Sequence, residues 1–274
     1  MTVVAVGTGV QVREFDSRDR SAVLRLVRED MLPGRPTVTG VVLDHVLEQE
    51  GMVCDVLTSV TGEVLGVVGW ALHAADAAGL VLWLHCRDDE QRLAEVLVQH
   101  VLGQFGRRQA YAYTEATALA PIGLPVFHRP GTRRALEACG FSGTEHARYL
   151  HHHLDTLSSR LYAIADLTAC PGASGWRLNL RERDGTQIGE AHISEPVDGT
   201  AELDWIILTP QRRHLGHILL EQCLTNLADR GIDHVTTCID APDDDHLYRE
   251  DVIHLHQAAG FTEVDHLYTY TRCP

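Results

Sequence analysis

The sequence repeats itself, and this repeat limits the possible folds more than any other feature. Under a shift of 122 positions, one strand-and-helix pattern falls on a second one: Trp83 on Trp205, Ala94 on Gly216, Leu97 on Leu219 and Leu102 on Leu224. Under a shift of 120, residues 138–141 (Ala-Cys-Gly-Phe) fall on residues 258–261 (Ala-Ala-Gly-Phe), and His146 falls on His266. Matches at two separate places with nearly equal offset predict two copies of one fold.

The second copy of this pattern, residues 201–229, is the clearer one. Leu203, Trp205 and Ile207 lie two apart, which is typical of a strand with one buried face, and the strand ends before Pro210. Beyond it, apolar residues recur every three or four positions up to residue 227, which predicts an amphipathic helix. The first turn of a helix has unpartnered backbone N–H groups and the positive end of the helix dipole, so a phosphate is stabilised there. Arg212 and Arg213 add positive charge at this turn.

Residues 211–216 (Gln-Arg-Arg-His-Leu-Gly) resemble the acyl-CoA signature of the GCN5-related N-acetyltransferases, or GNAT proteins. That signature is Gln or Arg, two residues, Gly, one residue, then Gly or Ala. Gln211 and Gly216 match its ends, whereas His214 stands in place of the middle glycine. The resemblance implies acetyl-CoA as co-substrate, with its pyrophosphate at Gln211, Arg212, Arg213, His214, Leu215, Gly216 and His217.

The resemblance also implies an α+β fold of two tandem GNAT-like domains, each with a mixed, mostly antiparallel sheet flanked by helices. In this family the organising strand parts from the next one, here residues 234–239, and the pantetheine arm lies in the gap. The backbone of Ile206, Ile207 and Leu208 is then expected to bind that arm.

We expect a degenerate first domain over residues 1–155 and an abbreviated, acetyl-CoA-binding and catalytic second domain over residues 156–274. In the first copy, Asp88, Asp89 and Glu90 replace residues 210–212. These carboxylates would repel a pyrophosphate and can cap the following helix themselves. The first copy is therefore expected to lack a CoA loop and to form one wall of the substrate cleft. Residues 156–175 leave room for little more than one helix, expected near residues 161–167.

Acetyl transfer to an amine needs a base, a polarised carbonyl and a proton for the leaving thiolate. Glu202 and Asp204 share one face of the organising strand and are the candidate bases. The family commonly places the thiolate acid, a tyrosine, four residues before the Gly-Phe that ends the next helix, and His256 stands there. Competing donors are Tyr248, Tyr268 and Tyr270, and we favour His256 and Tyr248.

The formal net charge of −15 argues against nucleic acid as a partner and favours a cationic small amine. Residues 243–245, three aspartates, are either a site for such an amine or a solvated turn that caps a helix. No apolar run of about 18 residues exists, so no membrane partner is expected. The N-terminus lacks a signal-peptide pattern, so we expect a cytoplasmic protein, either monomer or homodimer.

A metal site is not expected. The seven cysteines are scattered without a CxxC spacing, which supports neither a disulfide framework nor a zinc site. Residues 151–153 are three histidines on a predicted strand. Consecutive strand residues point to opposite faces, so at most two of them could share an ion.

The predicted function is therefore acetyl transfer from acetyl-CoA to a primary amine of a small molecule. Candidates are an antibiotic in self-resistance, a natural product in biosynthesis, or a mycothiol-type precursor, since mycothiol synthases are also tandem GNAT proteins. An alternative is a non-catalytic GNAT-fold protein that senses acyl-CoA or acts as a scaffold, which His214 and His256 favour. Acetylation of protein N-termini or lysines is less favoured, because nothing indicates a peptide-binding groove.

Overall fold

A computed structural model describes residues 4–6, 9–73, 78–154, 166–170, 175–181, 184–208, 214–240 and 246–274, without the side chains of residues 4–6, 166 and 246–248. The chain divides into two compact units. The first contains residues 1–31, 37–147 and 265–274, and the second contains residues 32–36 and 148–264. The C-terminal residues thus group with the first unit, and a short segment near the N-terminus groups with the second.

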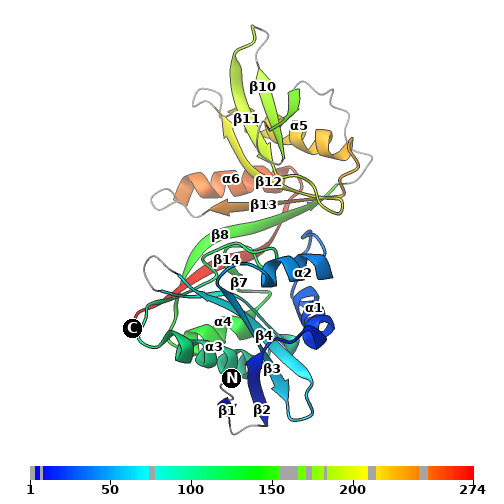
Figure 1. The fold of residues 1–274 in the computed structure, drawn as a ribbon. Helices are drawn as coiled ribbons and strands as arrows, with labels where there is room; N and C mark the ends of the chain where they lie inside the picture. The colour runs from blue at the N-terminus through cyan, green and yellow to red at the C-terminus, as the bar shows by residue number, and fades with distance from the viewer. Residues whose placement is uncertain are drawn as a thin grey trace. The chain divides into compact units, whose positions relative to one another are not determined.

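The first unit is built on a sheet of strand order β1-β2-β3-β4-β5-β6-β14-β8 (Figure 1). Its strands are β1 (Val4–Val6), β2 (Val10–Glu14), β3 (Met52–Ser59), β4 (Val64–Leu72), β5 (Gly79–Cys86), β6 (Ala110–Ala112), the start of β8 (Ser142–His153) and most of β14 (Thr262–Arg272). A two-residue strand, β7 (Leu124–Pro125), also pairs with β14. Neighbours from β1 to β5 are antiparallel, whereas β5 and β6 are parallel.

Helices cover both faces of this sheet. They are η1 (Ser17–Asp19), α1 (Arg20–Glu29), α2 (Gly40–Leu47), η2 (Arg87–Asp89), α3 (Gln91–Phe105) and α4 (Pro130–Ala138). Figure 1 shows α1 and α2 on one side of the sheet and α3 and α4 on the other. Every residue of β5 is buried, as expected for a strand covered on both faces. Asp16 caps η1 and Thr39 caps α2 through side-chain hydrogen bonds.

The second unit has the strand order β8-β13-β12-β11-β10-β9. Its elements are the rest of β8, β9 (Asp166–Ala169), β10 (Trp176–Arg181), β11 (Gln187–Ile193), β12 (Thr200–Leu208), α5 (Gly216–Ala228), β13 (His234–Asp240), α6 (His246–Ala258) and the start of β14. The predicted hairpin around residues 184–185 is confirmed, because β10 and β11 are antiparallel and Gly185 has a φ of 89°. The strands β12 and β13 are parallel, like β5 and β6 in the first unit.

The sheet of the second unit has one apolar and one polar face. Its apolar side chains, such as Leu203 and Val235, pack under α5 and α6 in one buried cluster with Leu219 of α5. Alternate residues of the same strands, such as Glu202 and Asp204, point to the other face, as the period of two requires. The polar face is where the candidate site lies.

Two expectations about the linking segment have different outcomes. Of the helix expected near residues 161–167, residues 161–165 lie outside the described residues, whereas residues 166–169 form strand β9 instead. The pairing of β9 with β10 gives these residues backbone partners that a local pattern cannot reveal. Among the helices that the structure describes, none is long and apolar enough to cross a membrane.

Candidate functional site

The parallel strands β12 and β13 separate shortly after they meet. They pair from Thr200–His234 to Glu202–Thr236, and within these two fully described strands the ladder ends there. One residue later, the Leu203 carbonyl accepts a hydrogen bond of 2.8 Å from the Thr237 hydroxyl instead of from a backbone N–H. The strand β12 nevertheless continues to Leu208, and among the described strands its last residues pair with β11 and not with β13. The predicted separation of these two strands is therefore present.

Two carboxylates stand on β12 at the point of separation. Burial raises the pKa of Glu202, Arg35 opposes this shift, and the nearby Asp204 adds to it. The Glu202 side chain still reaches solvent. A carboxyl group that is accessible and yet poorly solvated has an increased affinity for a proton, which is what a general base for an amine requires.

Asp204 is held by His192 of β11 and by Ser194, the residue directly after that strand. Its Oδ2 lies 2.5 Å from His192 Nδ1, and the Ser194 hydroxyl donates to Oδ1 at 2.9 Å. The His192 ring stacks on Trp205, with 5.7 Å between ring centroids. An ionised Asp204 makes His192 Nδ1 the donor, since a carboxylate can only accept. Asp204 is therefore more constrained than Glu202.

The segment of residues 32–36 brings further groups to this face. Tyr149 on β8 is buried, and its hydroxyl donates to the Pro33 carbonyl at 2.8 Å. Burial raises the pKa of Tyr149, so its hydroxyl keeps its proton. The Arg35 Nε is buried without a hydrogen-bond acceptor among the described residues. A buried donor of this kind indicates a group that completes the site.

Sequence reasoning did not identify four of these residues: Arg35, Tyr149, His192 and Ser194. The one signal available was the alternation of His192 and Ser194 on the predicted strand 187–195, which places both on one face. Their register against Asp204 depends on an irregularity between His192 and Ile193, which the sequence does not reveal.

The residues predicted as proton donors have different positions. His256 on α6 is buried, its Nδ1 lies 2.8 Å from the Val252 carbonyl, and its ring packs edge-on against Phe261. Burial lowers the pKa of His256, so its imidazole is neutral at pH 7. Tyr248 lies in the first turns of α6, but its side chain is outside the described part of the structure. Tyr268 and Tyr270 belong to the first unit.

The predicted cofactor-binding residues lie at the end of β12 and the start of α5. Ile206, Ile207 and Leu208 pair with β11. Gln211, Arg212 and Arg213, like the aspartates 243–245, lie outside the described residues. His214 and Leu215 precede α5, and His217 Nδ1 contacts the His214 carbonyl at 3.1 Å. The first turn of α5 carries no side-chain cap.

Gly216 is the first residue of α5, and its lack of a side chain has a visible reason. A Cβ at this position would lie 3.1 Å from Leu255 Cδ2 and 3.4 Å from Leu208 Cδ1. The glycine therefore allows the start of α5 to lie close to both α6 and β12.

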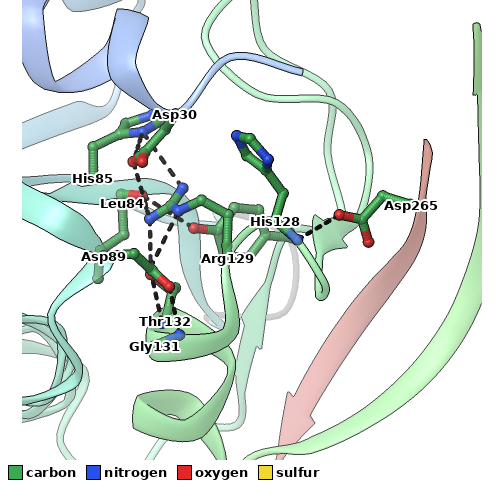
Figure 2. Close-up of polar contacts among 10 residues, drawn as sticks. Asp30, Leu84, His85, Asp89, His128, Arg129, Gly131, Thr132 and Asp265 are labelled. Atoms are coloured by element: carbon green, nitrogen blue, oxygen red, sulfur yellow. Dashed lines mark hydrogen bonds and ion pairs between the residues drawn. The ribbon is translucent and has the colours of Figure 1, made fainter. Parts of the chain in front are cut away.

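The first unit contains the same strand separation, but its own side chains fill it. The strands β5 and β6 pair from Gly79–Ala110 to Val81–Ala112 and then part. The Leu84 carbonyl beyond this point accepts from Arg129 Nη2 at 2.9 Å and from the Tyr113 hydroxyl at 3.2 Å. Figure 2 shows the Arg129 side chain lying between Leu84, Asp30 and Asp89.

Arg129 is held in a buried polar network. Its guanidinium lies 3.3 Å from a carboxylate oxygen of Asp30 and 3.3 Å from one of Asp89, and it donates to the Thr132 hydroxyl at 2.7 Å. The Asp30 carboxylate also lies 2.8 Å from His85 Nδ1. Burial lowers the pKa of His85, so this imidazole is neutral.

The carboxylate of Asp89 has a different role from the expected one. It accepts from the backbone N–H of Gly131 and Thr132, and thus caps α4 rather than the helix α3 that follows it in sequence. The positive φ of Asp88 (54°) and Asp89 (47°) turns the chain in this direction. The expectation that these carboxylates cap the next helix is therefore wrong for Asp89, because its partner lies more than forty residues away in sequence.

Comparisons with known proteins were made on both sequence and structure. No family model matches the sequence, and no curated protein matches it. Among solved structures, a GCN5-related N-acetyltransferase from Sphaerobacter thermophilus is similar, with a TM-score of 0.64, 14% identity, and coverage of 98% of this chain and 96% of that chain. A tandem GNAT protein from the clavulanic acid biosynthesis pathway has a TM-score of 0.64, 16% identity, and coverage of 96% and 98%.

A third similar structure is an acetyltransferase of the GNAT family from Colwellia psychrerythraea. Its TM-score is 0.56 at 11% identity, with coverage of 95% of this chain and 99% of that chain. At such identities the likeness concerns the fold, and it extends over both units. The chain therefore has the fold of the GCN5-related N-acetyltransferases in its tandem arrangement.

Proposed function

We propose that the second unit is an N-acetyltransferase that transfers an acetyl group from acetyl-CoA to a primary amine of a small molecule. The observation that carries this proposal is the separation of β12 from β13 directly after Glu202, with Glu202 and Asp204 standing at that point. Acetyl transfer needs a base and a binding site for the acetyl donor close to each other, and here the candidate base stands beside the separated strands that would bind the donor.

Acetyl-CoA would supply the activated acetyl group. The residues present fit it, because the ladder between β12 and β13 stops before Ile206, Ile207 and Leu208, whose backbone groups can bind an extended arm. The start of α5 suits a pyrophosphate, because Leu215 at its N-cap has no side-chain hydrogen bond to this turn and the helix dipole favours an anion there. Residues 211–217 are the proposed pyrophosphate loop.

Glu202 is the proposed general base and removes a proton from the acceptor ammonium. Its raised pKa brings it closer to the pH at which it works, which increases the efficiency of a base. Asp204 already accepts hydrogen bonds from His192 and Ser194 and is better suited to hold the cationic acceptor. The net charge of −15 favours an acceptor of positive charge.

The proton for the leaving thiolate is better supplied by Tyr248 than by His256. In the neutral state, His256 uses its Nδ1–H for the Val252 carbonyl, and its lowered pKa makes the imidazolium scarce at pH 7. A tyrosine hydroxyl keeps its proton at that pH and can donate it. Tyr248 is therefore our choice for this role, although both residues were predicted.

The experiment is a calorimetric titration of acetyl-CoA followed by a thiol-release assay over a panel of amines. The panel contains aminoglycosides, basic peptide antibiotics, a cysteinyl pseudodisaccharide and histone-like peptides. Natural-product amines come first, since one similar structure belongs to a biosynthesis pathway for clavulanic acid. We expect one acetyl-CoA site per chain and turnover of a small cationic amine. Absence of acetyl-CoA binding would refute the proposal.

The Glu202→Gln variant tests the role of the base. We expect kcat to fall by roughly 10²- to 10⁴-fold with little change in acetyl-CoA affinity. The matched control is Glu221→Gln, a carboxylate on the exposed face of α5, which should change neither quantity. In the wild type, kcat/KM should fall at acid pH with a midpoint above pH 4.5, the ordinary pKa of glutamate, because the pKa of Glu202 is raised.

A non-catalytic acyl-CoA-binding protein is the second candidate function. The packed and neutral state of His256 favours it, because the position that the family uses for a proton donor then has a structural role. This candidate predicts binding of acetyl-CoA without thiol release on any amine of the panel.

A further inference from the structure

A tight turn carries Arg35 in the second unit. Residues 32–35 form a β-turn that is closed by a hydrogen bond of 3.2 Å from the Arg35 N–H to the Leu32 carbonyl. Pro33 and Gly34 occupy its central positions, and Gly34 has a φ of 76°, which together are typical of a type II turn. Both residues restrict the backbone of this turn, so the position from which the Arg35 side chain starts is well defined.

The turn is held against two strands of the polar face. The Tyr149 hydroxyl of β8 donates to the Pro33 carbonyl at 2.8 Å. A Cβ on Gly34 would lie 2.9 Å from Thr236 Cγ2 on β13, so this glycine allows the turn to approach that strand closely. Thr236 is also the residue that pairs with Glu202 on β12. The turn therefore lies next to Glu202, at the start of the strand separation.

The guanidinium of Arg35 has no partner within the described part of the chain. No residue there forms a hydrogen bond or an ion pair with it, and its Nε is buried without an acceptor. The side chain as a whole is partly exposed, so a molecule from solvent can reach it. Because buried donors in proteins nearly always have an acceptor, this nitrogen indicates an acceptor that comes from outside the chain.

Glu202 does not supply that acceptor, although it lies near. The positive charge of Arg35 opposes the rise in the pKa of Glu202, yet the pKa of this carboxyl group stays raised and no ion pair forms between the two side chains. Asp204 stands two residues further along the same face of β12, roughly 6.5 Å along the strand. One unpaired cation and two carboxylates thus lie close together on this face.

We infer that the acceptor amine also carries a carboxylate, which Arg35 binds, and that it is a basic amino acid such as lysine or ornithine. A guanidinium presents N–H groups in a planar fork that matches both oxygens of a carboxylate. The α-ammonium group next to this carboxylate then lies at Glu202, and the side-chain ammonium group at Asp204. A basic amino acid also has the net positive charge that the proposed function requires. The inference rests on that function and names its acceptor.

Arg35 determines specificity in this scheme and moves no proton. The α-ammonium group gives one proton to Glu202, and the nitrogen then forms its bond to the acetyl carbon. The carbon–sulfur bond breaks, Tyr248 gives its proton to the thiolate, and the second proton from the nitrogen restores the Tyr248 hydroxyl. The products are the N-acetylated amino acid and CoA with a free thiol, and one proton remains on Glu202 for release to solvent.

The experiment compares two amino acids with diamines that lack only the carboxylate. Lysine is paired with cadaverine, and ornithine with putrescine. Calorimetry measures the binding of each to the full chain, with and without CoA. We expect the wild type to bind the better amino acid about 10- to 100-fold more tightly than its diamine, because hydrogen bonds between charged groups are among the stronger ones in proteins.

The variants are Arg35→Met and Arg35→Lys, with Arg181→Met as the control at an exposed arginine of β10. Arg35→Met should lose the preference for the amino acid and bind the diamine like the wild type, which also shows that the variant is folded. Arg35→Lys keeps the charge without the planar fork, so its preference should be intermediate. The control should keep the full preference.

Two results would overturn the inference. One is wild-type protein that binds neither amino acid more tightly than its diamine, and the other is a preference that Arg35→Met leaves unchanged. A thiol-release assay with acetyl-CoA and the same compounds tests the proposed function separately. Binding of an amino acid through Arg35 without thiol release would refute acetyl transfer to it, whereas acetylation of other amines alone would refute the inference and support the proposed function.

Discussion

Replacement of Arg129 by methionine tests whether the filled strand separation stabilises the first unit. The side chain of Arg129 is 3% exposed, and those of its two carboxylate partners, Asp30 and Asp89, are 10% and 14% exposed. Methionine keeps most of the volume of the stem but leaves these carboxylates without their cation. Removal of one partner from a buried ion pair costs about 3 to 5 kcal/mol. That is a large part of the 5 to 15 kcal/mol by which a typical domain is stable.

The matched control is Arg133→Met on the same helix. Arg133 pairs with Glu137 at 2.9 Å, but both side chains are more than 40% exposed, so we expect a loss of about 0.3 to 0.5 kcal/mol. Urea unfolding gives the free energies, and hydrogen exchange with mass spectrometry locates the loss. Peptides from β5 and α4 should exchange faster in Arg129→Met, and those from α5 should not.

The pH dependence gives an independent check of the same reasoning. Burial would raise the pKa of Asp30, but Arg129 and His85 lower it below the ordinary 3.8. In the wild type this carboxylate therefore stabilises the fold above that pH, and the contribution is lost as the pH falls through the lowered pKa. Without Arg129, burial is opposed by His85 and His128 but no longer by the guanidinium, so the loss in Arg129→Met should shrink as the pH is lowered toward 4. A loss of less than about 1 kcal/mol at pH 7 would refute the reasoning.

Two further predictions concern the first unit. Gly131→Ala should prevent α4 from docking, because a Cβ at this position would lie 1.7 Å from the Asp89 carbonyl oxygen. The control is Gly103→Ala in α3, where a Cβ would meet no atom within 4 Å. This control should raise the free energy of unfolding in urea by up to about 1 kcal/mol. Asp19→Asn should cost about 1 to 3 kcal/mol, because Asp19 accepts two hydrogen bonds from Arg13 at 2.6 and 2.7 Å. These bonds lower the pKa of Asp19, so the difference from wild type should decrease in acid unfolding as the pH falls from 3.8 through the lowered pKa.

Local patterns predicted those features whose causes are local. The alternation at residues 203–207 located β12, and the recurrence of apolar residues every three or four positions located α5. The separation of β12 and β13 came from the resemblance. The strand β9 was missed because its stability comes from pairing with β10, which no local period records.

The parts of the site that sequence missed are those that depend on register. His192 and Ser194 meet Asp204 because β11 and β12 pair with an irregularity that shifts the register beside His192. Asp89 caps α4 because the fold brings the two together across 42 positions. Arg35 and Tyr149 come from segments more than 100 residues apart in sequence and meet through the Leu32–Pro36 segment of the second unit. The spacing of residues within one segment does not determine strand register or contacts between distant segments.

The divergence of the two copies can be followed through one pair of arginines. Under the shift of 120 that matches the ends of the two later helices, Arg129 corresponds to Arg249. Both are buried and both donate to a strand carbonyl, but Arg129 contacts Leu84 on β5, whereas Arg249 contacts Ile239 on β13 at 3.4 Å. In the first copy the arginine thus bonds the strand that corresponds to β12.

An acid in the turn accounts for this difference. Asp89 attracts Arg129 toward β5 and caps α4 at the same time, and Asp30 fixes the guanidinium from a second side. The second copy has Pro210 and Gln211 where the first has Asp88 and Asp89, so its turn has no carboxylate that could attract Arg249 from β13 toward β12. Asp89 therefore has two effects on the first copy, because it adds negative charge to the turn after β5 and also holds the arginine that bonds the Leu84 carbonyl beyond the strand separation. Since both effects come from the same residue, a filled strand separation and a turn that disfavours an anion are expected to occur together.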